Sequence, residues 1–381
     1  MTDTSTLLPQ LHKWSSEDIF FIGNEYFNDL ISGIKNAKEF IDFECYIFYP
    51  DNLGKIIIAL LIEASKNGVY VRLIIDGYGS LNWNTLQLSE LTDSGIEVKI
   101  FHPLPWHLSL YKKTIVKEGF INKFLYLSSR INKRDHRKLY IVDKTTAWSG
   151  SMNITSSHLN QNNGDALWLD CGVKITGESI LELSDNFDEI WKHKIHYNTE
   201  NEHLPFRTNN NIIKRQHKNN ELIHLLKSCK NRIWIINAYL APSHRIVNAL
   251  KHARSNGVDV KLIISRHSDV VFFPLISTTY YAELLKAGIE IYEHNEYIIH
   301  AKTILLDDMA FVGSSNLNHR SFLHDLELDI ILKHTTSLQK LKNKFLKLTN
   351  NSEKITQEKL INLPWHYRIL GKIIWRIRYW L

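Results

Sequence analysis

The chain reads His136-Arg-Lys138-Leu-Tyr-Ile-Val-Asp143 and, 164 residues later, His300-Ala-Lys302-Thr-Ile-Leu-Leu-Asp307. Each stretch is followed by a Gly-Ser-x-Asn group, at residues 150–153 and 313–316. One such pattern carries little weight by itself, but a second copy with the same downstream group indicates an internal duplication. We therefore expect two similar lobes and a single active site that takes one histidine and one lysine from each lobe.

The segments around these stretches repeat one order of predicted strands and helices. In the first half, apolar strands at 40–48, 68–75 and 94–101 alternate with helical patterns at 53–66 and from residue 86. In the second half, strands at 232–237, 257–264 and 287–292 accompany a helix at 246–255. The alternation predicts an α/β protein in which each lobe is a mostly parallel β-sheet flanked by helices, with the active site at the lobe interface.

Shifts in composition divide the 381 residues into four parts. We expect an N-terminal lobe at 1–197, a polar linker at 198–220, a C-terminal lobe at 221–350 and a basic amphipathic tail at 351–381. The first lobe also carries an insertion at about 104–134, in which basic residues are interleaved with aromatic ones.

The paired stretches suit phosphate chemistry. In each, the histidine and the lysine are two positions apart at the start of a predicted strand, so their side chains point to one face. Lysine ammonium groups neutralise phosphate oxygens, a neutral imidazole can attack phosphorus, and a protonated imidazole can give a proton to the leaving alcohol. Because the lysines supply the positive charge, we expect no metal and no cofactor.

The Gly-Ser-x-Asn groups and two carboxylates complete the expected site. We expect the glycines to let the backbone approach the phosphate, and the polar side chains to bind it: Ser151, Asn153, Ser314 and Asn316. An attacking imidazole also needs an acceptor behind its second ring nitrogen. Asp170 and Glu327 follow the two histidines at comparable distances, within strand-like alternation. We expect Asp170 to hold His136, and Glu327 to hold His300.

These residues resemble the paired His-x-Lys-x4-Asp motifs of the phospholipase D superfamily. Within that superfamily the chain is most similar to the shorter bacterial cardiolipin synthases. The similarity lies in several strand and loop motifs, at 43–51, 75–80, 237–242, 292–294, 320–321 and Glu327. It covers about residues 20–350, and it adds Asp143 and Asp307 to the catalytic residues.

The resemblance implies a phosphatidyltransferase. It would move a phosphatidyl group from phosphatidylglycerol, through a phosphohistidine, to the alcohol of a second phospholipid, and so form cardiolipin. His136 would be the nucleophile and His300 the acid and base, although the near symmetry of the lobes leaves the reverse assignment open. A phospholipase D-type hydrolase or a nuclease would use the same residues with water as acceptor. A non-catalytic membrane scaffold is a third alternative.

Charge and composition bear on partners and location. A net charge of +6 favours anionic partners, and we expect these to be anionic phospholipids (phosphatidylglycerol and cardiolipin) rather than nucleic acid. Tryptophan and basic residues accompany apolar ones at 104–134 and 363–381, which predicts peripheral membrane association through both segments. We see no secretory signal, and three scattered cysteines are expected to be reduced. These features predict a cytoplasmic protein on the inner face of the cell membrane.

Overall fold

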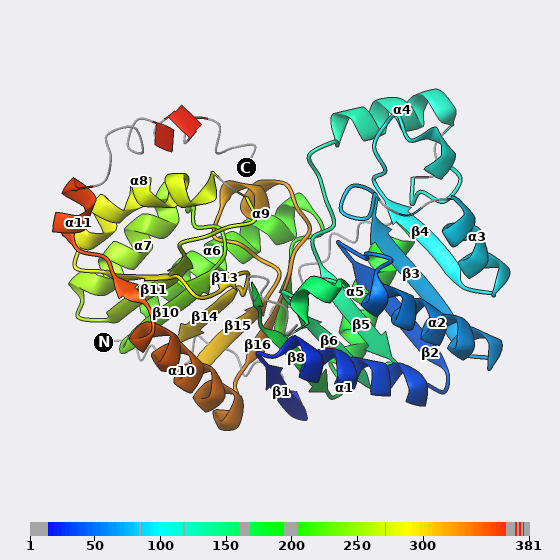
Figure 1. Ribbon diagram of the computed structural model, residues 1–381, viewed down its shortest axis with the longest axis horizontal. Helices are drawn as coiled ribbons and strands as arrows, with labels where there is room; N and C mark the ends of the chain where they lie inside the picture. The colour runs from blue at the N-terminus through cyan, green and yellow to red at the C-terminus, as the bar shows by residue number, and fades with distance from the viewer. Residues whose placement is uncertain are drawn as a thin grey trace.

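The computed structural model describes residues 14–81, 83, 85–116, 119–159, 168–193, 204–270, 272–362, 370, 371, 373, 374 and 376. The described chain forms two lobes, each built on one large sheet flanked by helices (Figure 1). The expected α/β architecture of two similar lobes is confirmed.

The first lobe has a seven-stranded sheet of order β1-β8-β6-β5-β2-β3-β4. Its strands are β1 (Ser16–Phe20), β2 (Phe40–Cys45), β3 (Tyr70–Asp76), β4 (Glu97–Phe101), β5 (Lys138–Val142), β6 (Thr146–Gly150) and β8 (Gly172–Thr176). Its helices are α1 (Gly23–Asn36), α2 (Asn52–Lys66), α3 (Thr85–Asp93), α4 (Phe120–Ser129) and α5 (Ile180–Trp191), with short 3-10 turns η2 (Leu108–Leu110) and η3 (Ser156–His158).

The second lobe has an eight-stranded sheet of order β17-β12-β11-β10-β14-β15-β16-β9. Starting from β9, it repeats the order of the first sheet, and β17 is the added strand beyond β12. Its strands are β9 (Phe206–Thr208), β10 (Arg232–Asn237), β11 (Asp259–Ser265), β12 (Glu290–His294), β14 (Thr303–Leu306), β15 (Met309–Gly313), β16 (Leu328–Leu332) and β17 (Glu353–Lys354). Its helices are α6 (Ile212–Ser228), α7 (His244–Ser255), α8 (Phe273–Lys286), α9 (His319–Leu323), α10 (Thr335–Asn350) and α11 (Gln357–Ile361).

The expectation of mostly parallel sheets is wrong. Only the β2-β3-β4 and β10-β11-β12 strands run parallel, whereas β5, β6, β8 and β1, and their counterparts β14, β15, β16 and β9, join antiparallel. The parallel strands are the ones linked by helices. The repeated stretch instead folds into a hairpin, because two to three residues between β5 and β6, or β14 and β15, leave no room for a crossover.

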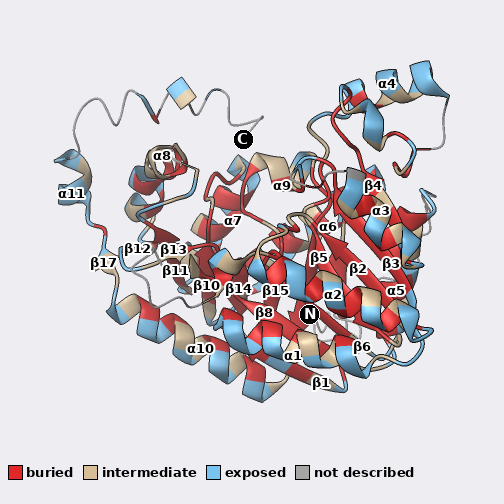
Figure 2. Ribbon diagram, turned by 45° about the vertical axis from the view of Figure 1, so that its right-hand side comes forward, coloured by how far each residue is buried: buried red, intermediate tan, exposed pale blue. Residues whose placement is uncertain are grey.

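The two sheets share one apolar core. Leu139 and Ile141 of β5 point into it, together with Trp234 and Ile236 of β10 from the other lobe. Tyr140 and Val142, one position along in β5, point the other way and pack under the helices of the first lobe. The sheets are buried on both faces, as their near-continuous apolar strands require, and Figure 2 shows them in the buried colour. The three cysteines are buried free thiols.

Two expected boundaries are wrong. The described part of the predicted linker, from residue 204 to 220, is no linker, because β9 pairs with β16 and α6 begins at Ile212. The tail begins later than residue 351, since β17 pairs with β12 and Ile355 is buried in the core of the second lobe. In each segment an apolar side chain, Phe206 or Ile355, is buried in a core despite the polar composition around it.

Candidate active site

The two His-x-Lys segments enter the sheets from the same side, each anchored on the opposite lobe. His136 precedes β5, and its amide donates to the carbonyl of Leu326 at 3.0 Å. His300 follows β13 (Ile298–Ile299), which pairs with β7 (Trp168–Leu169) of the first lobe, and its amide donates to the carbonyl of Leu169 at 2.9 Å. The backbone of each histidine is therefore held by the other lobe, at the residue that comes directly before that lobe's carboxylate.

The carboxylates behind the histidines are exchanged between lobes. His136 Nδ1 lies 3.1 Å from Glu327 Oε2, and His300 Nδ1 lies 2.7 Å from Asp170 Oδ1. Asp170 and Glu327 were correctly chosen from the sequence, but the expected pairing of each with its own lobe's histidine is wrong. The packing of the two lobes explains the exchange, because each carboxylate directly follows the residue that holds the other lobe's histidine.

The ring of His136 is held in one tautomer. Its Nδ1 also lies 3.1 Å from the carbonyl oxygen of Ser314, and a carbonyl can only accept, so Nδ1 carries the proton. The Nε2 nitrogen therefore has the lone pair that a nucleophile or base needs. Burial, followed by the charges of Lys138 and Lys302, lowers the pKa of His136 well below its ordinary value, so the free protein holds this imidazole neutral.

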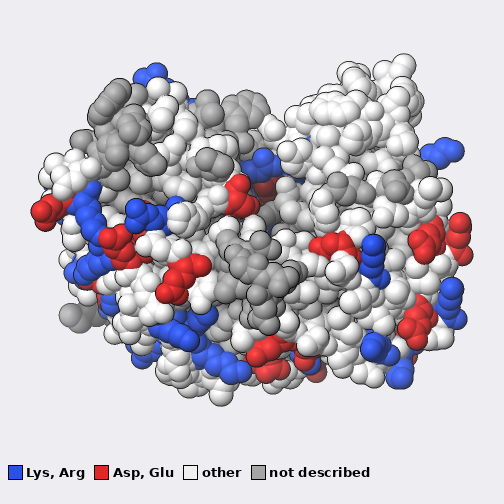
Figure 3. All heavy atoms as spheres, viewed as in Figure 1, with Lys and Arg blue, Asp and Glu red and all other residues white. Residues whose placement is uncertain are grey.

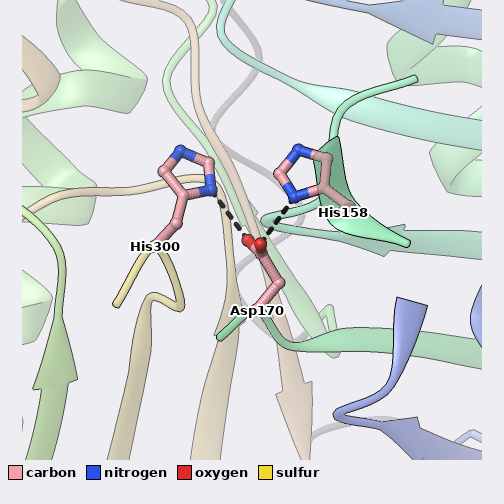
Figure 4. A group of neighbouring side chains, drawn as sticks. All are labelled: His158, Asp170 and His300. Atoms are coloured by element: carbon pink, nitrogen blue, oxygen red, sulfur yellow. Dashed lines mark hydrogen bonds and ion pairs between the residues drawn. The ribbon is translucent and has the colours of Figure 1, made fainter. Parts of the chain in front are cut away.

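His300 shares Asp170 with a third histidine that sequence analysis missed. Figure 4 shows His158 and His300 pointing their Nδ1 atoms at the two oxygens of Asp170, each at 2.7 Å. Burial alone would raise the pKa of Asp170, but the two imidazoles outweigh it and hold that pKa well below its usual range. Burial and the charge of Lys302 lower the pKa of His300 to about 3. Asp170 is therefore a carboxylate, and His300 is a neutral ring in the free protein.

A signal for His158 exists in the sequence. His158 stands five residues after Asn153, and Ser321 stands five residues after Asn316. Ser321 Oγ donates to Glu327 Oε1 at 2.6 Å, just as His158 donates to Asp170. Extending the comparison of the two copies past Gly-Ser-x-Asn would have pointed to both residues.

His158, Asp170 and His300 lie close enough together to be considered as metal ligands. Their contacts are those of a hydrogen-bonded network instead. His158 Nε2 accepts from the amide of Asn153 at 3.2 Å, which leaves Nδ1 as the donor to Asp170. Both nitrogens of His158 are thus engaged, and its ring acts as a support for Asp170.

The two lysines are buried cations beside the histidines. Lys138 and Lys302 are 0% and 3% exposed. Burial lowers the pKa of Lys138 to about 8 and that of Lys302 to about 7, with nearby carboxylates limiting both shifts. Tyr46 and Tyr239, to which sequence analysis gave no role, place their rings 5.2 Å and 5.6 Å from the respective ammonium groups. Buried lysines of this kind favour an anion between them.

The Gly-Ser-x-Asn groups support the carboxylates. Ser151 Oγ donates to Asp170 Oδ1 at 2.7 Å, and Ser314 Oγ donates to Glu327. Close packing within the sheet also requires a glycine at position 150, since a Cβ there would lie 2.4 Å from the carbonyl oxygen of Cys171 in the next strand. The side chains of Asn153 and Asn316 are buried, and each holds an amide oxygen without a protein partner among the described residues.

Asp143 and Asp307 are not part of this site. Each follows the far end of its strand, at the sheet edge opposite the lysine. The Asp143 carboxylate accepts from the backbone amides of residues 38, 39 and 40, and that of Asp307 from the amides of residues 230, 231 and 232. Their inclusion among the catalytic residues is therefore corrected: both hold the chain that leads into β2 or β10.

The fold and the paired site define the class: an enzyme of phospholipase D type, whose two lobes form one phosphodiester-processing site. Residues 30–191 and 222–349 match the family described as "Cardiolipin synthase, PLD-like domain". The chain belongs to this family, and the resemblance seen in its motifs is confirmed.

Known relatives agree in sequence and fold. A cardiolipin synthase of Clostridium perfringens is 30% identical over 364 residues, which cover 90% of this chain and 72% of that protein. The major cardiolipin synthase of Bacillus subtilis is 29% identical over 370 residues, covering 93% of this chain and 73% of that protein. The solved phosphatidylserine synthase of Haemophilus influenzae shares the fold, with a TM-score of 0.69, 14% identity and 98% of each chain covered.

Proposed function

We propose that the chain is a phosphatidyltransferase of cardiolipin synthase type, which moves a phosphatidyl group from phosphatidylglycerol to a second phospholipid alcohol. The observation that carries this proposal is the pair of cross-lobe histidine–carboxylate contacts with one buried lysine beside each histidine. Membership of the cardiolipin synthase family supports the choice of substrates.

We assign the nucleophile to His136. Its Nε2 lone pair attacks phosphorus as the bond from phosphorus to the leaving glycerol oxygen breaks, giving a phosphohistidine. His300 gives its proton to that oxygen, then takes a proton from the acceptor hydroxyl as the new P–O bond forms and the P–N bond breaks. Burial and the charge of Lys302 keep His300 neutral in the free protein. The bound phosphate offsets that lysine charge, and the ionised Asp170 supports the protonated ring.

The other site residues have supporting roles. Lys138 and Lys302 neutralise the non-bridging oxygens of the phosphate, and Asn153 and Asn316 face it with their amide groups. Glu327 orients the ring of His136, while Ser151 and Ser314 hold the carboxylates of Asp170 and Glu327. Water in place of the lipid alcohol would turn the same residues into a hydrolase, so product analysis decides between transfer and hydrolysis.

The first prediction tests this scheme. The variants His136→Ala and His300→Ala should each reduce the conversion of phosphatidylglycerol vesicles to cardiolipin by at least about 1000-fold, because each removes a group that forms or breaks a bond. His252→Ala, on the exposed end of α7, is the matched control and should retain the wild-type rate. Mass spectrometry of the lipids measures cardiolipin and phosphatidic acid together.

Three outcomes would contradict the proposal. Retained transfer in both histidine variants would remove the phosphohistidine scheme. Phosphatidic acid without cardiolipin would make the protein a lipid hydrolase, and cleavage of DNA in place of lipid would make it a nuclease.

We also propose peripheral association with anionic membrane on the cytoplasmic side of the cell membrane. The insertion presents an apolar face on α4, where Phe120, Ile121, Phe124 and Leu125 are 61%, 72%, 42% and 60% exposed. Figure 3 shows the protruding α4 end as a nearly uncharged surface. Lys112, Lys123 and Arg130 lie in the same insertion and suit anionic headgroups. Among the described residues, no helix is long and apolar enough to cross a bilayer.

The C-terminal tail supports this proposal in part. Much of the segment at 363–381 that was expected to contact the membrane lies outside the described residues, namely 363–369, 372, 375 and 377–381. In the described part, Gly371 and Ile374 pack on the second lobe, while Leu370 and Ile373 are 45% and 58% exposed. Figure 1 places this part of the tail on the same side of the molecule as α4.

The second prediction concerns this surface. The double variant Ile121→Ser/Leu125→Ser should bind phosphatidylglycerol vesicles at least about tenfold more weakly, because each buried side chain of this kind contributes roughly 1.5–3 kcal/mol. Ile56→Ser/Leu181→Ser removes comparably exposed apolar residues from α2 and α5 and should bind like the wild type. Vesicle sedimentation measures both. Equal binding by the two variants would exclude α4 as a membrane contact.

A further inference from the structure

A cavity of about 460 Å³ lies between segments that lead into the active site. It lies between the end of α4, the start of α6 and the end of α9, and its lining includes residues 128–133, Arg215 and His324. Two of these segments run directly into the site, since Lys133 is three residues before His136 and His324 is three residues before Glu327. The proposed transfer mechanism uses no residue of this cavity.

The cavity is lined by three cations. They are Arg130, Lys133 and Arg215. Among the residues that the structure describes, none of the three has a carboxylate within ion-pair distance. Cations gathered without a paired carboxylate favour an anionic occupant, because their mutual repulsion is relieved only by negative charge.

Arg215 is the member that points most strongly to a ligand. Its side chain lines the cavity from the first turn of α6, and the residue is 6% exposed. Nη2 donates to the carbonyl oxygens of Asn209 and His324, at 3.4 Å and 3.2 Å, whereas buried Nη1 has no partner among the described residues. A buried guanidinium with an unused donor is costly unless a ligand accepts from it.

The electrostatics connect the cavity with the active site. Burial, followed by repulsion from Arg215 and Arg130, lowers the pKa of Lys133 to about 8. Burial lowers the pKa of Arg215, while Asp325 and Glu327 counteract the shift. Arg215 therefore lies within electrostatic reach of Glu327, the carboxylate that contacts His136.

The rim of the cavity adds apolar surface and a helix start. Ile131, Ile212 and Leu323 are 37%, 61% and 44% exposed there. The 17-residue helix α6 begins at the cavity with Asn211 as its N-cap, and the N-terminus of a helix favours negative charge. An occupant that combines an anionic phosphate with apolar chains would fit this lining, and a phospholipid has that combination.

We propose that this cavity binds the phosphate of the acceptor phospholipid during transfer. The inference rests on the proposed function, in which two phosphates must be present at once. One is carried on His136 between the two buried lysines, and the other belongs to the lipid whose hydroxyl attacks. The second phosphate needs cations of its own, and Arg130, Lys133 and Arg215 supply them next to the site.

Product partition tests the proposal. Lys133→Gln and Arg215→Gln should lower the ratio of cardiolipin to phosphatidic acid made from phosphatidylglycerol vesicles at least tenfold, with donor consumption within twofold of wild type. Transfer to deuterium-labelled glycerol, a soluble alcohol without phosphate, should be unchanged when it is measured as labelled phosphatidylglycerol. Lys66→Gln removes the same charge from an exposed lysine in the last turn of α2, outside the cavity lining, and should behave like the wild type. An equal loss of transfer to glycerol and to lipid in Lys133→Gln would overturn the proposal, as would an unchanged ratio.

A second measurement does not depend on transferase activity. Acetylation of Lys133 by acetic anhydride, followed by mass spectrometry of the whole protein's peptides, should slow at least fivefold with phosphatidylglycerol vesicles. It should not slow with phosphatidylcholine vesicles, and Arg215→Gln should remove the protection. Protection by inorganic phosphate alone would make this a free-anion site and overturn the lipid assignment. Absence of protection by either would overturn the site itself, whereas protection without cardiolipin synthesis would overturn only the transferase.

Discussion

At the scale of single residues, the two halves of the active site differ behind otherwise equivalent histidines. Asp170 is held by Ser151 and by His158, whereas Glu327 is held by two serines, Ser314 and Ser321. Burial raises the pKa of Glu327 to about 7, with Lys218 and its hydrogen bonds opposing the shift, while the pKa of Asp170 is lowered. The duplicated site is therefore electrostatically asymmetric, which favours distinct roles for the two rings.

The third prediction follows from that asymmetry. His158 lowers the pKa of His300, after burial and Lys302, so His158→Ala should raise it. Because His300 must be protonated to give its proton to the leaving oxygen, the alkaline limb of the pH–rate profile should move to higher pH. The variant should also lose about tenfold in kcat, because Asp170 is less well oriented, equivalent to about 1.4 kcal/mol. Ser321→Ala, the corresponding change behind His136, should lower kcat without that shift of the alkaline limb. Rates on a soluble phosphodiester measure both, and an unshifted limb in His158→Ala would contradict the coupling.

The fourth prediction concerns the buried lysines. A lysine is charged only below its pKa, and these values are about 8 for Lys138 and about 7 for Lys302. Dimethyl phosphate stays a monoanion across this range, so it should raise the melting temperature more at pH 6 than at pH 9, by a factor of two or more. Sodium chloride at equal ionic strength is the control for screening. A larger rise at pH 9 would mean that the lysines are not the anion-binding groups.

At the scale of secondary-structure elements, the repeated stretch is a hairpin with different tasks at its two ends. The His-x-Lys end of β5 or β14 faces the active site, and the aspartate end fastens the hairpin to the chain before β2 or β10. Asp143 and Asp307 follow their strands with φ of 51° and 39°, in the left-handed region that non-glycine residues seldom adopt. The aspartates thus stabilise a tight turn by accepting backbone amides.

The fifth prediction separates these two tasks. Asp143→Asn should destabilise the protein by about 1–3 kcal/mol, because it weakens charge-assisted bonds to three amides. The kcat of the folded protein on a soluble phosphodiester should stay within twofold of wild type. Thermal unfolding and steady-state rates measure the two effects. A loss of kcat comparable to that of His136→Ala, with an unchanged melting temperature, would return Asp143 to the catalytic residues.

At the scale of the whole molecule, neither lobe contains a complete site. The β7–β13 pair and the bridge from Asp135 to Leu326 carry each histidine segment onto the other lobe, and the shared apolar core fixes the two sheets against one another. A histidine and its carboxylate are separated by 191 residues in one pair and by 130 in the other. The site is therefore a product of lobe assembly, and the cavity beside it is built from segments of both lobes as well.

The sequence by itself determined the duplication, the alternation of strands and helices, and the set of histidines, lysines and carboxylates that meet. These follow from local patterns: a strand places residues two apart on one face, and a repeat of the same pattern builds the same lobe twice. Only the tertiary structure decided which carboxylate serves which histidine, and that the aspartates of the motif lie at the far end of their strands, away from the site. Those outcomes depend on how two lobes pack across their interface, and spacing along one chain carries no record of contacts between segments more than a hundred residues apart.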